Sequence, residues 1–185
     1  MNDECRTNTK RWLEEAVIGM NFCPFAASVY RTGQVRIVVS AVEDIGEAIQ
    51  ATIDEAVDLL ETPDGEAVTS LVVFSEGLRD FERFLDAAET VRQALGQAGV
   101  DGVLQVATFH PDYQFAGTEP DDLGNYTNRA PYPILHLLPE ALVTEAVDTH
   151  PDPEGIPDEN IERLRRMGRD EVEALWAEFS PPKPR

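Results

Sequence analysis

Apolar and polar residues follow two different periods in the first part of the chain. In residues 9–20 the apolar side chains recur at spacings of three and four, which predicts an amphipathic helix that ends near residues 19–21. Residues 35–41 form a β-branched run and predict a strand. The helical period returns after Asp44, where Asp44 and Glu47 predict a capping box at the start of a second helix.

The middle of the chain repeats this order of strand and helix. Residues 68–74 are almost continuously apolar, as in a central strand that is covered on both faces. A helical pattern over residues 80–96 ends near two glycines, and residues 103–109 predict a third strand. Short connections between these elements predict successive right-handed parallel crossovers, with an antiparallel two-layer arrangement as the alternative.

The last third of the chain predicts one more strand, followed by helices. Residues 134–138 are apolar and lie between Pro133 and Pro139. Because proline cannot donate a hydrogen bond to a sheet, this strand is predicted at an edge. Three further helices are predicted, over residues 139–147, 157–167 and 170–179. Asp170 and Glu173 predict a capping box for the last of them.

These elements predict an α/β fold. We expect a single domain over residues 1–180, with an about four-stranded, mostly parallel or mixed sheet, helices packed on it and additional C-terminal helices. Residues 63–65 are predicted to form a turn, and residues 181–185 a disordered tail. A chain of 185 residues is long enough for one substantial core, and it contains no internal repeat.

The charge balance narrows the classes of partner. Acidic side chains number 35 and basic ones 15, so the formal net charge is -20. A field of this sign repels phosphate backbones and anionic membranes, so we expect neither nucleic acid nor membrane as a partner. The first 30 residues lack the order of a signal peptide, and Cys5 and Cys23 do not form a disulfide framework. We therefore expect a cytoplasmic protein with reduced thiols.

The stretch 109–138 is the best candidate for a functional site. It contains two of the three histidines, three of the four tyrosines, paired aspartates and several prolines, and most of it fits neither helix nor strand. A loop of this length within a compact domain is usually functional or disordered, and its aromatic residues favour order. A ligand site at the end of the third strand, with parts of the loop around it, is the resulting hypothesis.

Three residues are candidates for chemistry. His110 follows the third strand and could act as a general acid or base, or else bond to the loop backbone. Asp122, beside Asp121, could orient His110 or hold a cation, although an Asp-rich turn that bonds its own backbone is the simpler interpretation. Cys23 could be a nucleophile, or a small buried hydrophobic residue between Phe22 and Pro24.

The remaining candidates would bind a ligand. Arg129 could grip a carboxylate or phosphate, or pair with a nearby aspartate and hold the loop closed. Four neighbours could orient the ligand or satisfy the loop's own backbone: Tyr113, Asn125, Tyr126 and Asn128. His136, by contrast, lies inside the predicted fourth strand and is interpreted as a core histidine. A small anionic ligand is thus expected, and no motif for a cofactor, a metal or a phosphate loop is present.

Five segments resemble those of a known family. They are residues 21–26, 109–115, 120–133, 135–138 and 156–161. In this order the segments resemble the uncharacterised bacterial family called domain of unknown function 1415. The resemblance covers nearly the whole chain and implies a bacterial, single-domain α/β protein, but it implies no reaction and no catalytic residues.

Three function classes follow from the sequence. The first is a small-molecule enzyme or ligand-binding domain, with an anion-accepting site under the loop of residues 110–133. The second is a non-catalytic protein-interaction module in which the same loop is a rigid scaffold. The third is a metal-dependent hydrolase. Polar side chains that converge on an open pocket would favour the first, and side chains used up in mutual hydrogen bonds would favour the second.

Overall fold

The computed structural model describes residues 2–63, 66, 68–100 and 102–181. In chain order the elements are α1 (Asn2–Trp12), the π-helix η1 (Leu13–Ile18), α2 (Ala26–Arg31), β1 (Val35–Ser40), α3 (Ile45–Glu61), β2 (Thr69–Phe74), α4 (Phe81–Gln97), β3 (Leu104–Phe109), the 3-10 helix η2 (Leu123–Thr127), β4 (Ile134–Pro139), α5 (Glu140–Thr149), α6 (Ile156–Met167) and α7 (Arg169–Phe179). The predicted tail, except Pro181, and two of the three residues of the predicted turn at 63–65 lie outside the described residues.

The described strands form one mixed sheet of four, in the order β1-β2-β4-β3. β1 and β2 are parallel, whereas β4 runs antiparallel to both β2 and β3. In the middle of the sheet Val38 pairs with Val72, Val72 with Leu135, and Leu135 with Thr108. The expected α/β fold with a mixed sheet and added C-terminal helices is therefore confirmed.

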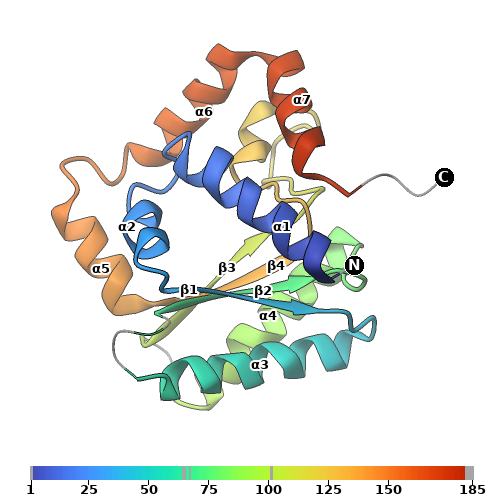
Figure 1. The fold of residues 1–185 in the computed structure, drawn as a ribbon, viewed down its shortest axis with the longest axis vertical. Coiled ribbons are helices and arrows are strands. Elements are labelled where there is room, and N and C mark those ends of the chain that lie inside the picture. Colours follow the sequence, from blue (N-terminus) through green and yellow to red (C-terminus); the bar gives the residue numbers. More distant parts are fainter. Residues whose placement is uncertain (1, 64–65, 67, 101, 182–185) are drawn as a thin grey trace.

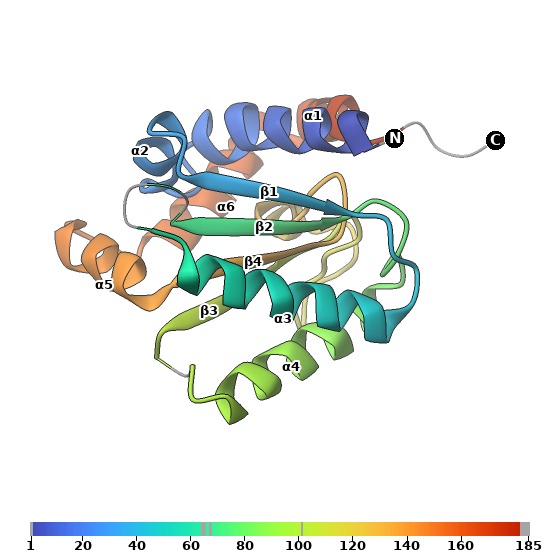
Figure 2. The ribbon, with the colours of Figure 1, turned by 60° about the horizontal axis from the view of Figure 1, so that its bottom comes forward.

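Helices cover both faces of the sheet (Figures 1 and 2). On one side, which we call the α3/α4 face, Val72 and Phe74 of β2 pack with the buried residues of these two helices. On the other side, the loop face, Leu71 and Val73 pack with residues of α1, η1, α6, α7 and the loop of residues 110–133. All six residues of β2 are buried, as expected for a central strand covered on both faces.

The predicted edge position of the fourth strand is wrong, because β4 lies between β2 and β3. Its prolines remain at the ends of the strand, where a missing N–H group costs the sheet little. Pro133 still contributes its carbonyl, which accepts a hydrogen bond from the backbone N–H of Phe74 at 3.0 Å. Ile134, Leu135 and Leu137 are buried in the two cores, and this burial is what a central position provides.

Three further differences concern helices. The first helix begins at Asn2 rather than at residue 9, and its second part is a π-helix. The helix α2 was not predicted. The predicted cap of the last helix by Asp170 is wrong: α7 starts after Gly168, which has a φ of 83° and no side-chain capping bond. Asp44, in contrast, accepts a hydrogen bond from the backbone N–H of Glu47, as expected for the first residue before α3.

Candidate ligand-binding site

The loop of residues 110–133 is ordered by its own polar side chains, and Asn125 lies at its centre. Asn125 is fully buried, with an exposed fraction of 0%. Its Oδ1 accepts hydrogen bonds from the backbone N–H of Phe115 at 3.0 Å and from the Thr118 hydroxyl at 2.9 Å. Its Nδ2 donates to the carbonyl of Glu119 at 2.9 Å. This side chain therefore joins the two halves of the loop, and no part of it remains at the surface.

The side chain of Arg129 fastens the same loop from the other side. Its Nε donates to the carbonyl of Tyr113 at 3.2 Å and its Nη2 to the carbonyl of Pro120 at 2.6 Å. The guanidinium also lies 4.4 Å from the centre of the Tyr126 ring, a cation–π contact. Arg129 thus holds the loop closed, through backbone carbonyls rather than through the aspartates considered from the sequence.

The carbonyl of Arg129 is a second point of attachment. It accepts a hydrogen bond from the indole of Trp12 at 3.1 Å and another from the indole of Trp176 at 3.0 Å. Trp12 belongs to α1 and Trp176 to α7, so the two ends of the described chain meet at one atom of the loop. Both lone pairs of this carbonyl are thereby satisfied.

The two tyrosines among the candidates pack within the frame of the loop. Tyr126 has an exposed fraction of 8%, and its ring meets that of Trp176 edge-on at 5.2 Å. Tyr113 is half-buried, with its ring 5.2 Å from that of Phe81 and 5.0 Å from that of Phe115. These contacts explain why a segment with so little regular structure is ordered.

His110 lies in the core beneath α4, with an exposed fraction of 0%. Its Nδ1 accepts a hydrogen bond from the backbone N–H of Asp112 at 3.0 Å, so Nε2 carries the proton and donates to the carbonyl of Leu78 at 3.1 Å. Its ring centre is 5.2 Å from that of Phe81 and 5.1 Å from that of Phe84. Burial lowers the pKa of His110. This geometry favours a neutral histidine that bonds the loop backbone, the second of the two interpretations from the sequence.

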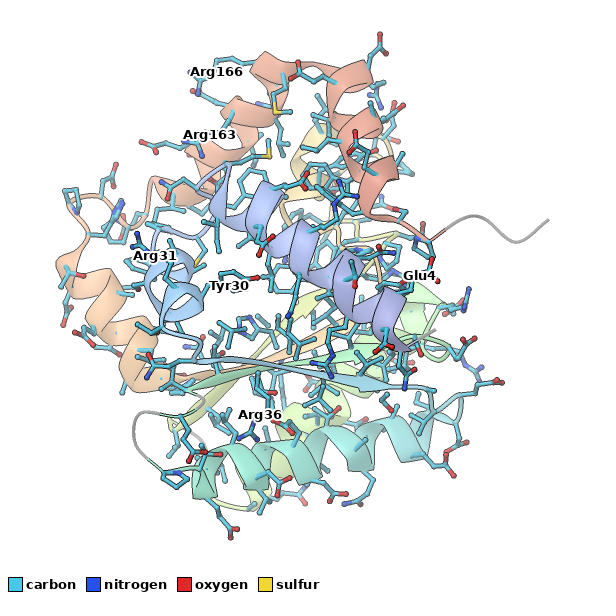
Figure 3. All side chains as sticks on the ribbon, viewed as in Figure 1. Glu4, Tyr30, Arg31, Arg36, Arg163 and Arg166 are labelled. Carbon is cyan, nitrogen blue, oxygen red and sulfur yellow. The ribbon has the colours of Figure 1, made fainter. Side chains whose placement is uncertain are left out.

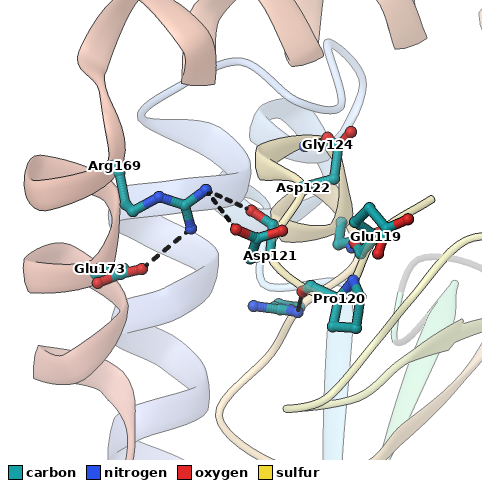
Figure 4. A network of polar contacts seen from close by, with 9 residues as sticks. Glu119, Pro120, Asp121, Asp122, Gly124, Arg169 and Glu173 are labelled. Carbon is teal, nitrogen blue, oxygen red and sulfur yellow. Dashed lines mark hydrogen bonds and ion pairs between the residues drawn. The ribbon is translucent and has the colours of Figure 1, made fainter.

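The paired aspartates have different partners (Figure 4). Asp121 is exposed and forms an ion pair of 3.2 Å with Arg169, which also reaches Glu173 on its own helix. Asp122 caps η2: its Oδ1 accepts a hydrogen bond from the backbone N–H of Gly124 at 2.7 Å. The second oxygen of Asp122 has no hydrogen bond within the described residues, and the side chain is only half-buried.

His136 lies on the loop face of the sheet. The Thr69 hydroxyl donates to the carbonyl of Leu137 at 2.7 Å, so the 2.7 Å contact between this hydroxyl and His136 places the proton on the histidine Nε2. Burial lowers the pKa of His136 from 6.5 to about 4. The ring is therefore neutral near pH 7, as the interpretation as a core histidine requires.

A pocket of about 610 Å³ lies beside this frame, where four segments of the chain meet. These segments are the end of η1 with the turn that follows it, the end of β3 with the adjoining loop, η2, and one face of α6. Apolar side chains make up most of the wall, among them Val17, Phe22, Phe109, Phe115 and Ile161. Trp12 lies behind Phe109 at 5.2 Å between ring centres, and Trp176 lies behind Phe22 at 6.3 Å.

The π-helix and the turn after it bring Cys23 to this pocket. A π-helix closes its backbone hydrogen bonds over five residues instead of four, and such turns within helices are frequent at functional sites. It is followed by Asn21, whose φ of 54° reverses the chain so that Phe22 and Cys23 face the pocket. The turn is tied to α6, because Asn160 donates to the carbonyl of Phe22 at 2.8 Å and Arg163 donates to that of Met20. Figure 3 labels Arg163 on α6.

Only part of the predicted site lines the pocket. Cys23, Asp122 and Asn128 do so. Cys23 lies in the turn after η1, whereas Asp122 and Asn128 flank the two ends of η2. Five predicted residues belong instead to the frame behind it: His110, Tyr113, Asn125, Tyr126 and Arg129. Of His110, Asp122 and Arg129, only Asp122 is therefore among the residues that line this pocket.

Four further polar residues line the pocket and had no assigned role: Thr118, Thr127, Asn160 and Arg165. A signal existed for Asn160, because it falls in the segment 156–161 that resembles the family. For Arg165 the signal was its spacing: residues 157, 161 and 165 are four apart and share one face of α6.

In the part of the chain that the structure describes, no three side chains of His, Cys, Asp or Glu are grouped so that they could hold a metal ion. No helix among the described residues combines the length and the apolar character needed to cross a membrane.

The chain matches the model of one protein family. This match covers residues 4–174, and the family is described as "Protein of unknown function (DUF1415)". Because almost the whole chain is matched, the protein belongs to this family. No curated protein and no solved structure matches the chain.

Proposed function

We propose that this protein binds a small molecule in the pocket between η2, α6 and the turn at residues 21–23. The observation that carries the proposal is the meeting of four sequence-distant segments around about 610 Å³ of space. Pockets for small molecules commonly measure about 300–1,000 Å³ and have mostly apolar walls with a few polar groups. The pocket described here has this size and this kind of wall.

The candidate residues divide into two groups in this proposal. Cys23, Asp122 and Asn128 face the ligand. His110 and Arg129, with Tyr113, Asn125 and Tyr126, keep the loop in the shape that forms one wall. Binding is better supported than catalysis, because no hydrogen bond among the described residues links Cys23 to a base. An enzyme of this design would use Cys23 as its nucleophile.

A second candidate function is a non-catalytic protein-interaction module. The observation in its favour is that the loop uses its buried polar side chains on its own backbone, as a rigid scaffold would. In that case the outer surface of the loop, with the exposed Glu119 and Asp121, would meet the partner.

A pocket-blocking variant tests the first proposal. We expect Cys23→Trp to fill part of the pocket and Cys23→Ala to leave it open, because Cys23 is half-buried in its wall. Small molecules that raise the melting temperature of the wild type should also raise that of Cys23→Ala, but not that of Cys23→Trp, since a ligand stabilises only the state that it binds. Compounds that stabilise both variants equally bind elsewhere and would contradict the proposal.

The two cysteines allow a second test in one experiment. Cys5 has an exposed fraction of 1%, and burial raises the pKa of its thiol to about 11, whereas Cys23 is partly exposed at the pocket. Iodoacetamide should therefore alkylate Cys23 in the folded protein and Cys5 only after unfolding. A pocket ligand should slow the alkylation of Cys23, which peptide mass spectrometry can follow. A stabilising ligand that leaves this rate unchanged would count against the pocket.

A further inference from the structure

Two opposite charges line the pocket without forming an ion pair. They are the carboxylate of Asp122 and the guanidinium of Arg165. Among the described residues neither of them has a salt-bridge partner, although neighbouring charges such as Asp121 and Arg169 are paired with each other. Arg165 is exposed and lines the pocket, so its guanidinium is available to a bound molecule.

The separation of the two charges follows from their elements. A Cβ atom built on Gly124 would lie 3.1 Å from the Asp122 carboxylate and 3.5 Å from the Ile161 side chain, so Asp122 is near the middle of α6. Arg165 comes four residues after Ile161 on the same face of this helix, a distance of about 6 Å along its axis. A single small molecule can therefore reach both groups.

Hydrogen-bond acceptors accompany the carboxylate. Asn160 uses its Nδ2 to donate to Phe22, and Asn128 uses its Nδ2 to donate to Thr108, so each amide is held with a fixed orientation. The Oδ1 of Asn160 accepts no hydrogen bond within the described residues, although the residue has an exposed fraction of only 7% and lines the pocket. The free oxygen of Asp122 and this amide oxygen are partners for N–H donors.

The rest of the wall is apolar and aromatic. Phe22 follows η1, whereas Phe109 and Phe115 belong to the end of β3 and the adjoining loop, and all three line the same pocket. Such a wall favours an apolar or aromatic body, and rings of this kind also attract an ammonium group through their faces.

From these observations, and resting on the proposed function, we infer that the ligand is a small zwitterion. Its ammonium group bonds to Asp122 and to the oxygen of Asn160, its carboxylate bonds to Arg165, and its apolar body lies against the phenylalanines. An amino acid with an apolar side chain has this chemistry. The net charge agrees with it, because the surrounding negative field opposes a plain anion but acts little on a molecule of zero net charge.

A matched set of compounds tests the inference by thermal shift and by protection of Cys23. L-phenylalanine carries both charges, phenethylamine lacks the carboxylate and 3-phenylpropanoate lacks the ammonium group. The remaining apolar amino acids and their amines extend the set. We expect at least one amino acid to bind, and its amine and acid analogues to bind about tenfold more weakly or worse, since each loses a charge-assisted contact.

Two variants test which charged group of the ligand each side chain binds. Asp122→Asn should keep η2 intact, because asparagine caps helices as well as aspartate does, and should weaken the amino acid but not its acid analogue. Arg165→Gln should weaken the amino acid but not its amine analogue. The matched controls are Asp121→Asn and Arg166→Gln, which change exposed neighbours that do not line the pocket and should leave every affinity unchanged.

The failures of the two proposals are distinguishable. If other compounds bind to Cys23→Ala and not to Cys23→Trp, while no amino acid of the set does, the inference of a zwitterionic ligand is wrong. The proposal that the pocket binds a small molecule is then still supported. The same conclusion follows if an amine or an acid binds as tightly as its amino acid. If no compound distinguishes Cys23→Ala from Cys23→Trp, both proposals fail.

Discussion

The two faces of the sheet are covered in different ways. On the α3/α4 face two helices of 17 residues each begin at an aspartate, Asp44 or Asp80, whose side chain accepts a backbone hydrogen bond three residues later. On the loop face, α6 and α7 begin without any side-chain cap, and a π-helix and a long loop fill the space between helices.

The source of order also differs between the faces. The helices of the α3/α4 face are specified by residues close to them in sequence. The loop face depends on contacts between distant segments: Trp12 and Trp176 to the carbonyl of Arg129, and Asn160 to that of Phe22. Irregular backbone held in this way leaves room for a pocket, which regular helices packed on a sheet fill with side chains. The candidate site therefore lies where tertiary contacts, rather than local propensity, determine the structure.

The largest effect should come from removing the main support of the loop face. Arg129→Ala deletes two hydrogen bonds from a charged group to carbonyls and the contact with Tyr126. We expect a loss of roughly 3–5 kcal/mol in the free energy of unfolding, measured by urea denaturation. Alkylation of Cys23 in the folded protein should become faster, because a wall of the pocket is loosened.

The control for this prediction lies on the opposite face. Arg83 is exposed on α4, and its side chain has no ion pair among the described residues. Arg83→Ala should change stability by less than about 0.5 kcal/mol and leave the alkylation rate of Cys23 unaltered. Equal losses in the two variants would show that Arg129 has no special place in the loop.

The free energy of unfolding should depend on pH because of two histidines, one on each face of the sheet. Burial lowers the pKa of His110, against α4, and lowers that of His136, on the loop face, to about 4. Because the unfolded state then takes up protons first as the pH falls, stability should be complete above about pH 6.5 and decrease toward pH 4. His136 alone should account for roughly 3 kcal/mol at the acidic end.

Comparison of variants isolates the histidines from the many carboxylates. His136→Gln keeps an N–H donor for Thr69 but does not titrate, so its urea stability should depend less steeply on pH between 6.5 and 4 than that of the wild type. An unchanged pH slope in His136→Gln would mean that the ring is accessible in the folded protein.

The sequence predicted the fold better than it predicted the place of each strand. β2 was recognised as central because residues 68–74 are almost continuously apolar, and α3 because of Asp44 and its apolar stripe. The place of β4 depends on which strands it meets after a long loop, and the flanking prolines suggested an edge that tertiary packing overrides. π-helices have no distinct periodic signal in a stretch as short as η1, so the first helix was expected to be regular.

The sequence indicated the region of the candidate site, but not which of its residues line the pocket and which hold the loop in place. Arg129 bonds to backbone carbonyls, which every residue carries, so no pattern in the sequence could identify these partners. His110 turns into the core because Phe81 and Phe84 of α4 receive its ring, and that contact is set by the packing of α4 on β3. Cys23 and Asp122 lie at the pocket, as part of the predicted set, because they flank turns whose direction the fold determines.

A smaller effect should appear as non-additivity between the two tryptophans. In Trp12→Phe or Trp176→Phe the carbonyl of Arg129 keeps one of its two donors, whereas the double variant leaves this part-buried carbonyl without either. We expect the double loss to exceed the sum of the single losses by about 1–2 kcal/mol in urea unfolding followed by circular dichroism. Trp12→Phe combined with Val91→Ala, on the α3/α4 face, should be additive. Additive losses in the tryptophan pair would mean that the shared carbonyl does not couple the two ends of the chain.

The smallest expected effect compares a helix that begins with a local cap with one that is held by tertiary contacts. Asp80 caps α4 by accepting the backbone N–H of Arg83 at 2.9 Å, so Asp80→Ala should cost about 1 kcal/mol of stability. Asp170 lies in the first turn of α7 but makes no capping bond, and Asp170→Ala should cost no more than a few tenths of a kcal/mol, through the helix dipole alone. Equal losses would mean that the helices of the loop face are locally specified after all. The expected difference would instead show that α7 is held by Val172, Trp176 and Phe179 packed against the loop, because these side chains are buried and its end is not capped.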